Sequence, residues 1–192
     1  MKMKKRAIVF PGIGYTCRRP LLYYTAMLAE ERGFDVLRLD YGPEVHSMRC
    51  RDADALAHAA ELACPKAAEQ IRKAGISSSA GRVLMISKSV GTLAAARIEA
   101  ELGLSAVHFM MTPIPAALLW LERTAGIFLS GTGDPYTGAE QVRAAAARFP
   151  ERAVIFADCN HSLERPGHTL EALANLEKVV RLLNKFIDSE FE

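Results

Sequence analysis

The chain has 192 residues, of which 50% are apolar and 24% are charged. This length and composition are typical of one folded unit with a sizeable core, so we expect a single domain over residues 1–192. Its 24 basic and 22 acidic residues give a formal net charge of only +2, which argues against nucleic acid or a membrane surface as the partner.

The N-terminus and the cysteines predict a cytoplasmic protein. The apolar run 7–10 is stopped by Pro11 and Gly12, so it is shorter than the roughly 7–15 apolar residues of a secretory signal. No segment approaches the ~20 apolar residues of a membrane span. The four cysteines form no CxxC pair, which favours reduced thiols inside the cell.

Short apolar runs alternate with longer amphipathic segments along the whole chain. This alternation is typical of a parallel sheet covered by helices. Pro65 is expected to kink or divide the second helix. In chain order we predict a strand at 7–10, a helix at 20–32, a strand at 35–39, a helix at 52–74, a strand at 83–87, a helix at 90–102, a strand at 106–110, a helix at 116–123, a strand at 127–130, a helix at 139–149, a strand at 153–156 and a helix at 169–186.

The loop after the first predicted strand is a candidate oxyanion site. In a parallel sheet, loops at the carboxyl ends of strands line the ligand crevice. Gly12 and Gly14 let the backbone approach a bound oxygen, so an N–H group here could stabilise negative charge in a transition state. A plain strand-to-helix turn is the alternative. Arg18 and Arg19 could attract an acidic substrate or simply lie in solvent at a helix start.

A dinucleotide-binding interpretation also begins at Gly12-Ile13-Gly14, with Asp40 after the second strand as the ribose-binding acid. Cys17 replaces the third glycine of the GxGxxG pattern. Asp40 also lies further along the chain than the ~20 residues that are usual. The nucleotide interpretation is therefore the weaker one.

Ser89 lies where the third predicted strand turns into an alanine-rich helix, within Ser-Lys-Ser-Val-Gly at 87–91. Small residues two before and two after a serine are typical of a nucleophile elbow, although Ser87 stands where glycine is usual. The Val90 N–H at the helix start is the expected first oxyanion donor. Lys88 is expected to point toward solvent or a neighbouring loop. The alternative is that Ser89 only caps the helix.

An acid and a base follow the last two predicted strands. Asp134 before a proline is ordinary turn chemistry when taken alone. His161 is the only one of the five histidines that combines a carboxyl-end loop with the chain order Ser, Asp, His. Asp158 is a rival acid, but it lies too near His161 in the sequence to orient the ring from its far side.

These motifs make the chain resemble the α/β-hydrolase superfamily, in particular its small lidless esterases and serine hydrolases. The resemblance covers nearly the whole domain. It rests on Pro-Gly-Ile-Gly-Tyr at 11–15, on the elbow at 87–91, and on Gly-Thr-Gly-Asp-Pro-Tyr at 131–136 followed by Asn-His-Ser-Leu-Glu at 160–164. It implies a three-layer αβα sandwich with a mainly parallel six-stranded sheet in the order 2-1-3-4-5-6. The first two strands of the full eight-stranded sheet and any cap domain would be missing.

The resemblance also implies a mechanism, in which a small acyl substrate is hydrolysed through an acyl-enzyme on Ser89 with His161 as base and Asp134 as acid. The oxyanion would be held by N–H groups of Val90 and of the Ile13–Gly14–Tyr15 region, and no metal or organic cofactor is expected. Trp120 is a candidate wall of the acyl pocket or part of a helix packed on the sheet. The alternatives are a non-catalytic protein of the same fold, a nucleotide-binding protein, and an acyltransferase using the same triad.

Overall fold

The structure, a computed structural model, describes residues 5–50 and 52–191. Each predicted strand is present, with ends that differ by no more than one residue. The strands are β1 (Arg6–Phe10), β2 (Asp35–Arg38), β3 (Arg82–Lys88), β4 (Ser105–Met111), β5 (Gly126–Gly131) and β6 (Ala153–Phe156). The helices are α1 (Pro20–Glu31), α2 (Gly42–His46), α3 (Ala53–Lys73), α4 (Val90–Leu102), α5 (Pro115–Leu118), α6 (Ala139–Arg148) and α7 (Thr169–Phe191), with a 3₁₀ turn at Pro150–Arg152.

The six strands form one parallel sheet in the order β2-β1-β3-β4-β5-β6, so the predicted strand order is confirmed. The chain adds β2 on one side of β1 and then crosses over to place β3 on the other side. The connections after β1 and β3 therefore leave the sheet on opposite faces. A crevice at the carboxyl ends of two such strands is where ligands bind in open parallel sheets.

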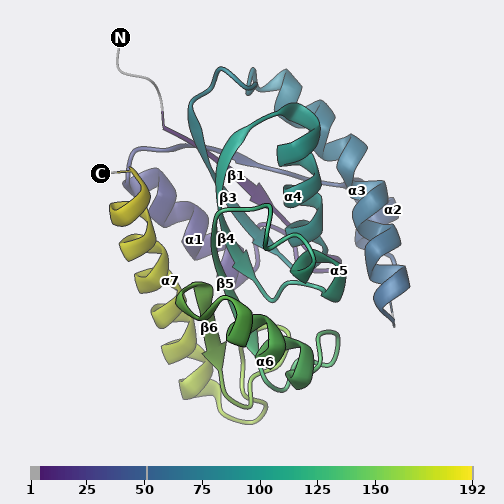
Figure 1. Ribbon diagram of the computed structural model, residues 1–192, viewed down its shortest axis with the longest axis vertical. Helices are drawn as coiled ribbons and strands as arrows, with labels where there is room; N and C mark the ends of the chain where they lie inside the picture. Colours follow the sequence, from purple (N-terminus) through teal and green to yellow (C-terminus); the bar gives the residue numbers. More distant parts are fainter. Residues whose placement is uncertain (1–4, 51, 192) are drawn as a thin grey trace.

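Helices cover both faces of this sheet, as the predicted three-layer arrangement requires. One face packs on α1 and α7, which lie side by side in Figure 1. The other face packs on α3 and α4, with α5 beside α4 and with α6 over β5 and β6. Because both faces are covered, the central strands β3 and β4 are buried along almost their whole length. This burial explains their continuous apolar sequences.

Helices α3 and α5 differ from the prediction. Helix α3 runs through Pro65 as one helix rather than being divided there; a proline removes one backbone donor from the ladder, which a long helix packed on α4 tolerates. The predicted helix 116–123 ends at Leu118, and tighter turns follow it, with Trp120 and Leu121 donating to carbonyls only three residues back. These turns place Leu121 in a small core cluster with Met110 and Phe128.

The connection after β2 contains a short helix, α2, where the sequence predicts only a loop, and α7 continues five residues past the predicted end at 186 to Phe191. In the described part of the chain, no helix has both the length and the apolar character needed to cross a bilayer.

Candidate active site

The structure brings Ser89, Asp134 and His161 together at the carboxyl edge of the sheet. Ser89 directly follows β3, Asp134 follows β5, and His161 follows β6. Ser89 Oγ lies 2.8 Å from His161 Nε2, and His161 Nδ1 lies 2.7 Å from Asp134 Oδ2. The three side chains therefore form one continuous chain of hydrogen bonds.

Ser89 occupies a strained backbone position between β3 and α4. Its φ of 57° and ψ of −126° lie outside the regions that L-residues ordinarily populate. Hydrogen bonds on both sides hold this conformation: the Ser89 N–H donates to the Met111 carbonyl, and the Thr92 N–H and hydroxyl both donate to the Ser89 carbonyl. In this conformation Oγ lies within hydrogen-bond distance of the imidazole.

Glycine is required at position 91 because the start of α4 lies against the backbone at the end of β1. A Cβ at this position would lie 2.5 Å from the carbonyl oxygens of both Phe10 and Pro11. Real Cβ atoms are not found so close to backbone, so the elbow or the following loop would have to move.

Replacing Gly91 with alanine should therefore lower the free energy of unfolding by about 3 kcal/mol, because the added methyl group overpacks rigid backbone. Gly138→Ala is the matched control, since a Cβ there meets no atom within 4 Å and only the helix N-cap preference is lost, at about 1 kcal/mol or less. Urea unfolding of the two variants gives the comparison. Equal stabilities would contradict the close approach at the elbow.

The acid is anchored by the backbone so that one oxygen is free for the histidine. Asp134 Oδ1 accepts hydrogen bonds from the N–H groups of Tyr136 at 2.9 Å and Thr137 at 3.4 Å. Oδ2 therefore faces the imidazole and accepts the Nδ1 proton of His161. This leaves Nε2 as an acceptor for the Ser89 hydroxyl, which is the tautomer that a general base requires.

The environment of His161 favours its neutral form. Burial lowers the pKa of His161, the positive charge of Lys88 lowers it further, and the hydrogen bond to Asp134 raises it in part. The Tyr136 ring packs edge-on against the imidazole, with ring centroids 4.8 Å apart. A neutral imidazole can accept a proton, so this balance suits a base that works near neutral pH.

The loops that carry the acid and the base are joined to each other. The Gly133 N–H donates to the Cys159 carbonyl, and the Asp158 N–H donates to the Thr132 hydroxyl. Gly131 lies so close to this loop that a Cβ would approach the Cys159 carbonyl oxygen to 2.1 Å. Asp158 takes part in this junction through its main-chain N–H. The carboxylate that contacts the histidine is that of Asp134, not that of Asp158.

Backbone donors lie beside the serine. Val90 is the first residue of α4, so its N–H has no acceptor within the helix. In the loop after β1, the Gly12 N–H donates to the Tyr15 carbonyl, and Gly14 takes a φ of +61°. Among the described residues, no acceptor pairs with the N–H groups of Ile13 or Gly14.

A cleft of about 490 Å³ opens in front of Ser89 and His161. Its first wall is the loop Ile13–Gly14–Tyr15, as the sequence predicts. Its second wall is the 46–50 segment between α2 and α3, together with Leu56, which the sequence analysis did not identify as part of a site. The only available signal was that this segment follows the carboxyl end of a predicted strand, where parallel sheets bind ligands. Lys88, Tyr136 and Ser162 complete the lining.

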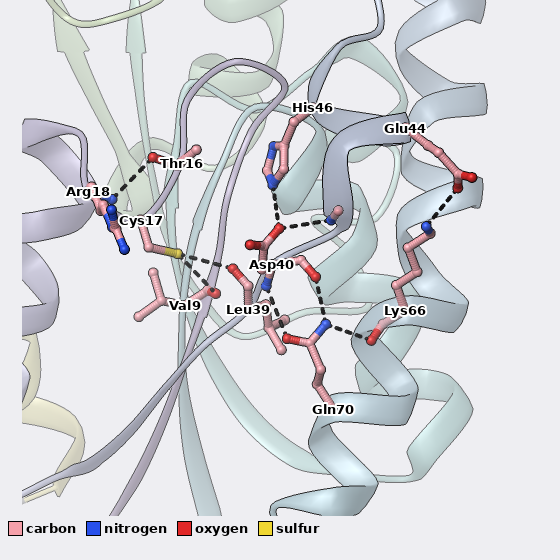
Figure 2. A network of polar contacts seen from close by, with 11 residues as sticks. Val9, Thr16, Cys17, Arg18, Leu39, Asp40, Glu44, His46, Lys66 and Gln70 are labelled. Atoms are coloured by element: carbon pink, nitrogen blue, oxygen red, sulfur yellow. Dashed lines mark hydrogen bonds and ion pairs between the residues drawn. The ribbon is translucent and has the colours of Figure 1, made fainter.

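A polar network fixes the second wall to the sheet (Figure 2). Asp40 Oδ1 accepts hydrogen bonds from the Gly42 N–H and from His46 Nε2, and these contacts hold the pKa of Asp40 below its usual value. Gln70 of α3 bonds both the N–H and the carbonyl of Asp40. Lys66 pairs with Glu44 on the outer side of the same wall.

Lys88 points toward a neighbouring loop, not toward solvent. Its side chain is 1% exposed, and its Nζ lies 4.3 Å from the centroid of the Tyr15 ring. In the described chain, no carboxylate forms an ion pair with it; Asp134 and Glu164 act on it only through space. Burial lowers the pKa of Lys88 to about 7, and those two carboxylates oppose this effect.

Replacing Lys88 with methionine should raise the free energy of unfolding by ~1–4 kcal/mol at pH 6, because a buried unpaired charge is removed. Burial in the folded protein lowers the pKa of this lysine from its ordinary value of 10.5 to about 7. The destabilisation caused by the buried charge is therefore complete below pH 7, and it decreases as the pH rises toward 10. Urea unfolding at pH 6 and pH 9 should show a shrinking difference between variant and wild type. Lys73→Met is the control, because Lys73 is 74% exposed; a pH-independent gain for Lys88→Met would contradict the charge explanation.

Other predicted site residues lie elsewhere. Trp120 is half-buried against the cluster that includes Val90 and Leu93, and it is not among the described residues that line the cleft. Arg18 and Arg19 are exposed just before α1. The nucleotide interpretation finds no support in the geometry, since α1 begins only at Pro20 and offers no helix N-terminus at the glycine turn.

Comparison with known proteins gives the fold. No family model and no curated protein matches the sequence. Among solved structures, Est1E from Butyrivibrio proteoclasticus has a TM-score of 0.67 at 12% identity, covering 98% of this chain and 90% of that one. A lidless α/β serine hydrolase from Xanthomonas campestris gives 0.63 at 14% identity over 97% and 82%, and the dienelactone hydrolase from Anabaena variabilis gives 0.63 at 18% over 98% and 87%. The chain has the α/β-hydrolase fold, as its motifs predict.

Proposed function

We propose that this chain of the α/β-hydrolase fold is a serine hydrolase that cleaves an ester or a related acyl bond. The observation that carries the proposal is the unbroken hydrogen-bond chain from Ser89 through His161 to Asp134, opening on a cleft. A hydroxyl is a poor nucleophile near neutral pH, and this arrangement supplies both the base and the acid that activate it.

Acylation would begin when the substrate carbonyl carbon lies against Ser89 Oγ. His161 Nε2 takes the hydroxyl proton as Oγ attacks, and the carbonyl oxygen becomes a tetrahedral oxyanion. The N–H groups of Val90 and of Ile13 or Gly14 are the donors for that oxygen. His161 then gives the proton to the leaving alcohol, and an acyl ester remains on Ser89.

Deacylation would repeat the same steps with water. His161 takes a proton from a water molecule, the resulting hydroxide attacks the acyl carbon, and the second oxyanion uses the same donors. When the intermediate collapses, His161 returns the proton to Ser89 Oγ and the free acid leaves. Asp134 stabilises the imidazolium in both halves of the cycle.

Labelling with a fluorophosphonate probe tests the proposal, because such probes react only with an activated serine. We expect one covalent adduct, located at Ser89 by mass spectrometry and absent in Ser89→Ala. The Ser87→Ala variant should still be labelled, since Ser87 is buried beside the site and its hydroxyl has no hydrogen-bond partner among the described residues. An unlabelled wild type would favour a binding protein of the same fold. Release of free acid, measured directly, separates hydrolysis from acyl transfer to another acceptor.

The pH dependence of kcat/KM provides a further prediction. Only neutral His161 can act as base, so activity falls on the acid side as the imidazole becomes protonated. Because burial and then Lys88 lower the pKa of His161, the acid limb should have its midpoint below the ordinary value of 6.5. A neutral ester assayed between pH 4.5 and 8 gives this midpoint. A value above 7 would contradict the described electrostatics.

A further inference from the structure

The side chains that line the cleft have an uneven charge. Lys88 and Arg49 both contribute to the lining, and no aspartate or glutamate among the described residues does. Asp134 lies behind His161 with its side chain 1% exposed, so it belongs to the base rather than to the cleft surface. A ligand in this cleft therefore meets positive charge without a competing carboxylate in the lining.

Lys88 is the unusual member of this pair. Arg49 is exposed to solvent, as most arginines are, but Lys88 is 1% exposed, and among the described residues only the Tyr15 ring is its close partner. An ammonium group in such surroundings is destabilising unless an anion compensates it. In the proposed hydrolysis this charge acts only on the pKa of His161 and contacts no substrate group, so the cleft contains a buried cation without an assigned partner.

We propose that the substrate carries a carboxylate group, and that Lys88 Nζ binds it inside the cleft while Arg49 attracts it at the mouth. This inference rests on the proposed hydrolase function and names the substrate class of the same site. One buried ammonium balances one negative charge, which fits a carboxylate better than a doubly charged phosphate. Lys88 and Ser89 are consecutive, with Cα atoms about 3.8 Å apart, so one small molecule can reach both.

The remaining charged groups around Lys88 are compatible with this role. Asp134 and Glu164 act on it from the loops after β5 and β6. His161 faces it as the base, and Tyr15 lies against it from the loop after β1. Burial raises the pKa of Tyr15 to about 12, so this phenol stays neutral. None of the four pairs with Nζ at ion-pair distance. A bound carboxylate would supply that partner and favour the protonated amine.

Two matched pairs of esters test the inference. The first compares mono-4-nitrophenyl adipate with 4-nitrophenyl hexanoate, so that the carboxylate is in the acyl chain. The second compares 3-carboxyphenyl butyrate with phenyl butyrate, so that it is in the leaving group. In at least one pair, wild-type kcat/KM at pH 7 should be ~10–100-fold higher for the anionic ester, the range expected for a charged hydrogen bond. The preference should weaken above pH 7, because the pKa of Lys88 in the protein without substrate is about 7 and the amine loses its charge above that pH.

The variants assign the preference to Lys88. Lys88→Met should remove the preference by lowering kcat/KM far more for the anionic ester than for the neutral one, whose rate responds only through the pKa of His161. Lys88→Arg should keep part of the preference. Lys73→Met, on the exposed end of α3, should change neither ester. Circular dichroism and thermal unfolding check that each variant is folded.

The possible outcomes separate this inference from the proposed function. Wild-type enzyme that is labelled by the fluorophosphonate and hydrolyses neutral esters, but shows no preference in either pair, overturns the substrate class alone. Equal losses for both members of a pair in Lys88→Met also overturn it, because the lysine would then act on the chemistry or the fold. Absence of labelling and of all hydrolysis would instead remove the proposed function.

Discussion

Replacing Ser89 with alanine should reduce kcat for ester hydrolysis about 10⁶-fold, the loss measured when the serine of a comparable triad is removed. Among the residues that the structure describes, the Ser89 hydroxyl is the one group hydrogen-bonded to His161 Nε2, so the proposed acyl-enzyme has no substitute nucleophile there. The backbone donors beside it remain and should leave a small residual rate over the uncatalysed reaction. Steady-state kinetics with a chromogenic ester gives the ratio.

Ser87→Ala is the control for this experiment. Ser87 is also a buried serine near the end of β3, but its Oγ has no hydrogen-bond partner in the described part of the chain. Removing that hydroxyl leaves no partner unsatisfied, so stability and activity should stay close to wild type. If Ser89→Ala retained the wild-type rate after purification away from contaminating esterases, the nucleophile would have to be sought elsewhere.

Replacing Asp134 with asparagine should lower kcat about 10⁴-fold without unfolding the protein. The amide oxygen can still accept the N–H groups of Tyr136 and Thr137, which places the amide NH₂ toward His161 Nδ1. The imidazole must then carry its proton on Nε2, where it donates to Ser89 and cannot accept from it. The loss thus arises from the wrong tautomer.

Asp158→Asn is the matched variant for the acid. Asp158 is exposed, and its N–H, not its carboxylate, makes the contact with Thr132. Its φ of 56° is one that asparagine adopts readily, so the loop should be preserved and kcat should change little. A larger loss in Asp158→Asn than in Asp134→Asn would mean that the acid had been assigned to the wrong loop.

The sequence predicts the sheet well because each strand has a local signal. Runs such as 83–87 are apolar throughout, and a small residue or a turn follows each of them, so strand positions and chain order follow from the pattern. Once the strands are parallel, the loops that carry Ser89, Asp134 and His161 must lie at the same edge. The meeting of these side chains is therefore largely determined by chain order.

Other features depend on contacts between distant segments, which no local pattern contains. The 46–50 segment becomes a wall of the cleft only because Asp40 and Gln70 fix it beside the sheet. Lys88 shares a face of β3 with Leu84 and Ile86, so alternation alone places it inside, yet its charge suggests solvent. The Tyr15 ring, which packs over Lys88 Nζ and comes from a distant loop, accounts for this burial.

The junction between the loops after β5 and β6 connects Asp134 and His161 independently of Ser89. The main chain joins their loops through Gly133 and Cys159, and Asn175 of α7 donates to the Leu163 carbonyl in the loop that carries His161. Ser89 is held separately, by the Met111 carbonyl of β4 and by Thr92 of α4, and it meets this unit through its contact with His161. The Ser89–His161 distance therefore depends on how the loop after β6 is held at the sheet edge, and α7 takes part in this through Asn175. If the chain is the proposed hydrolase, replacing Asn175 should change the rate while the His161–Asp134 hydrogen bond stays in place.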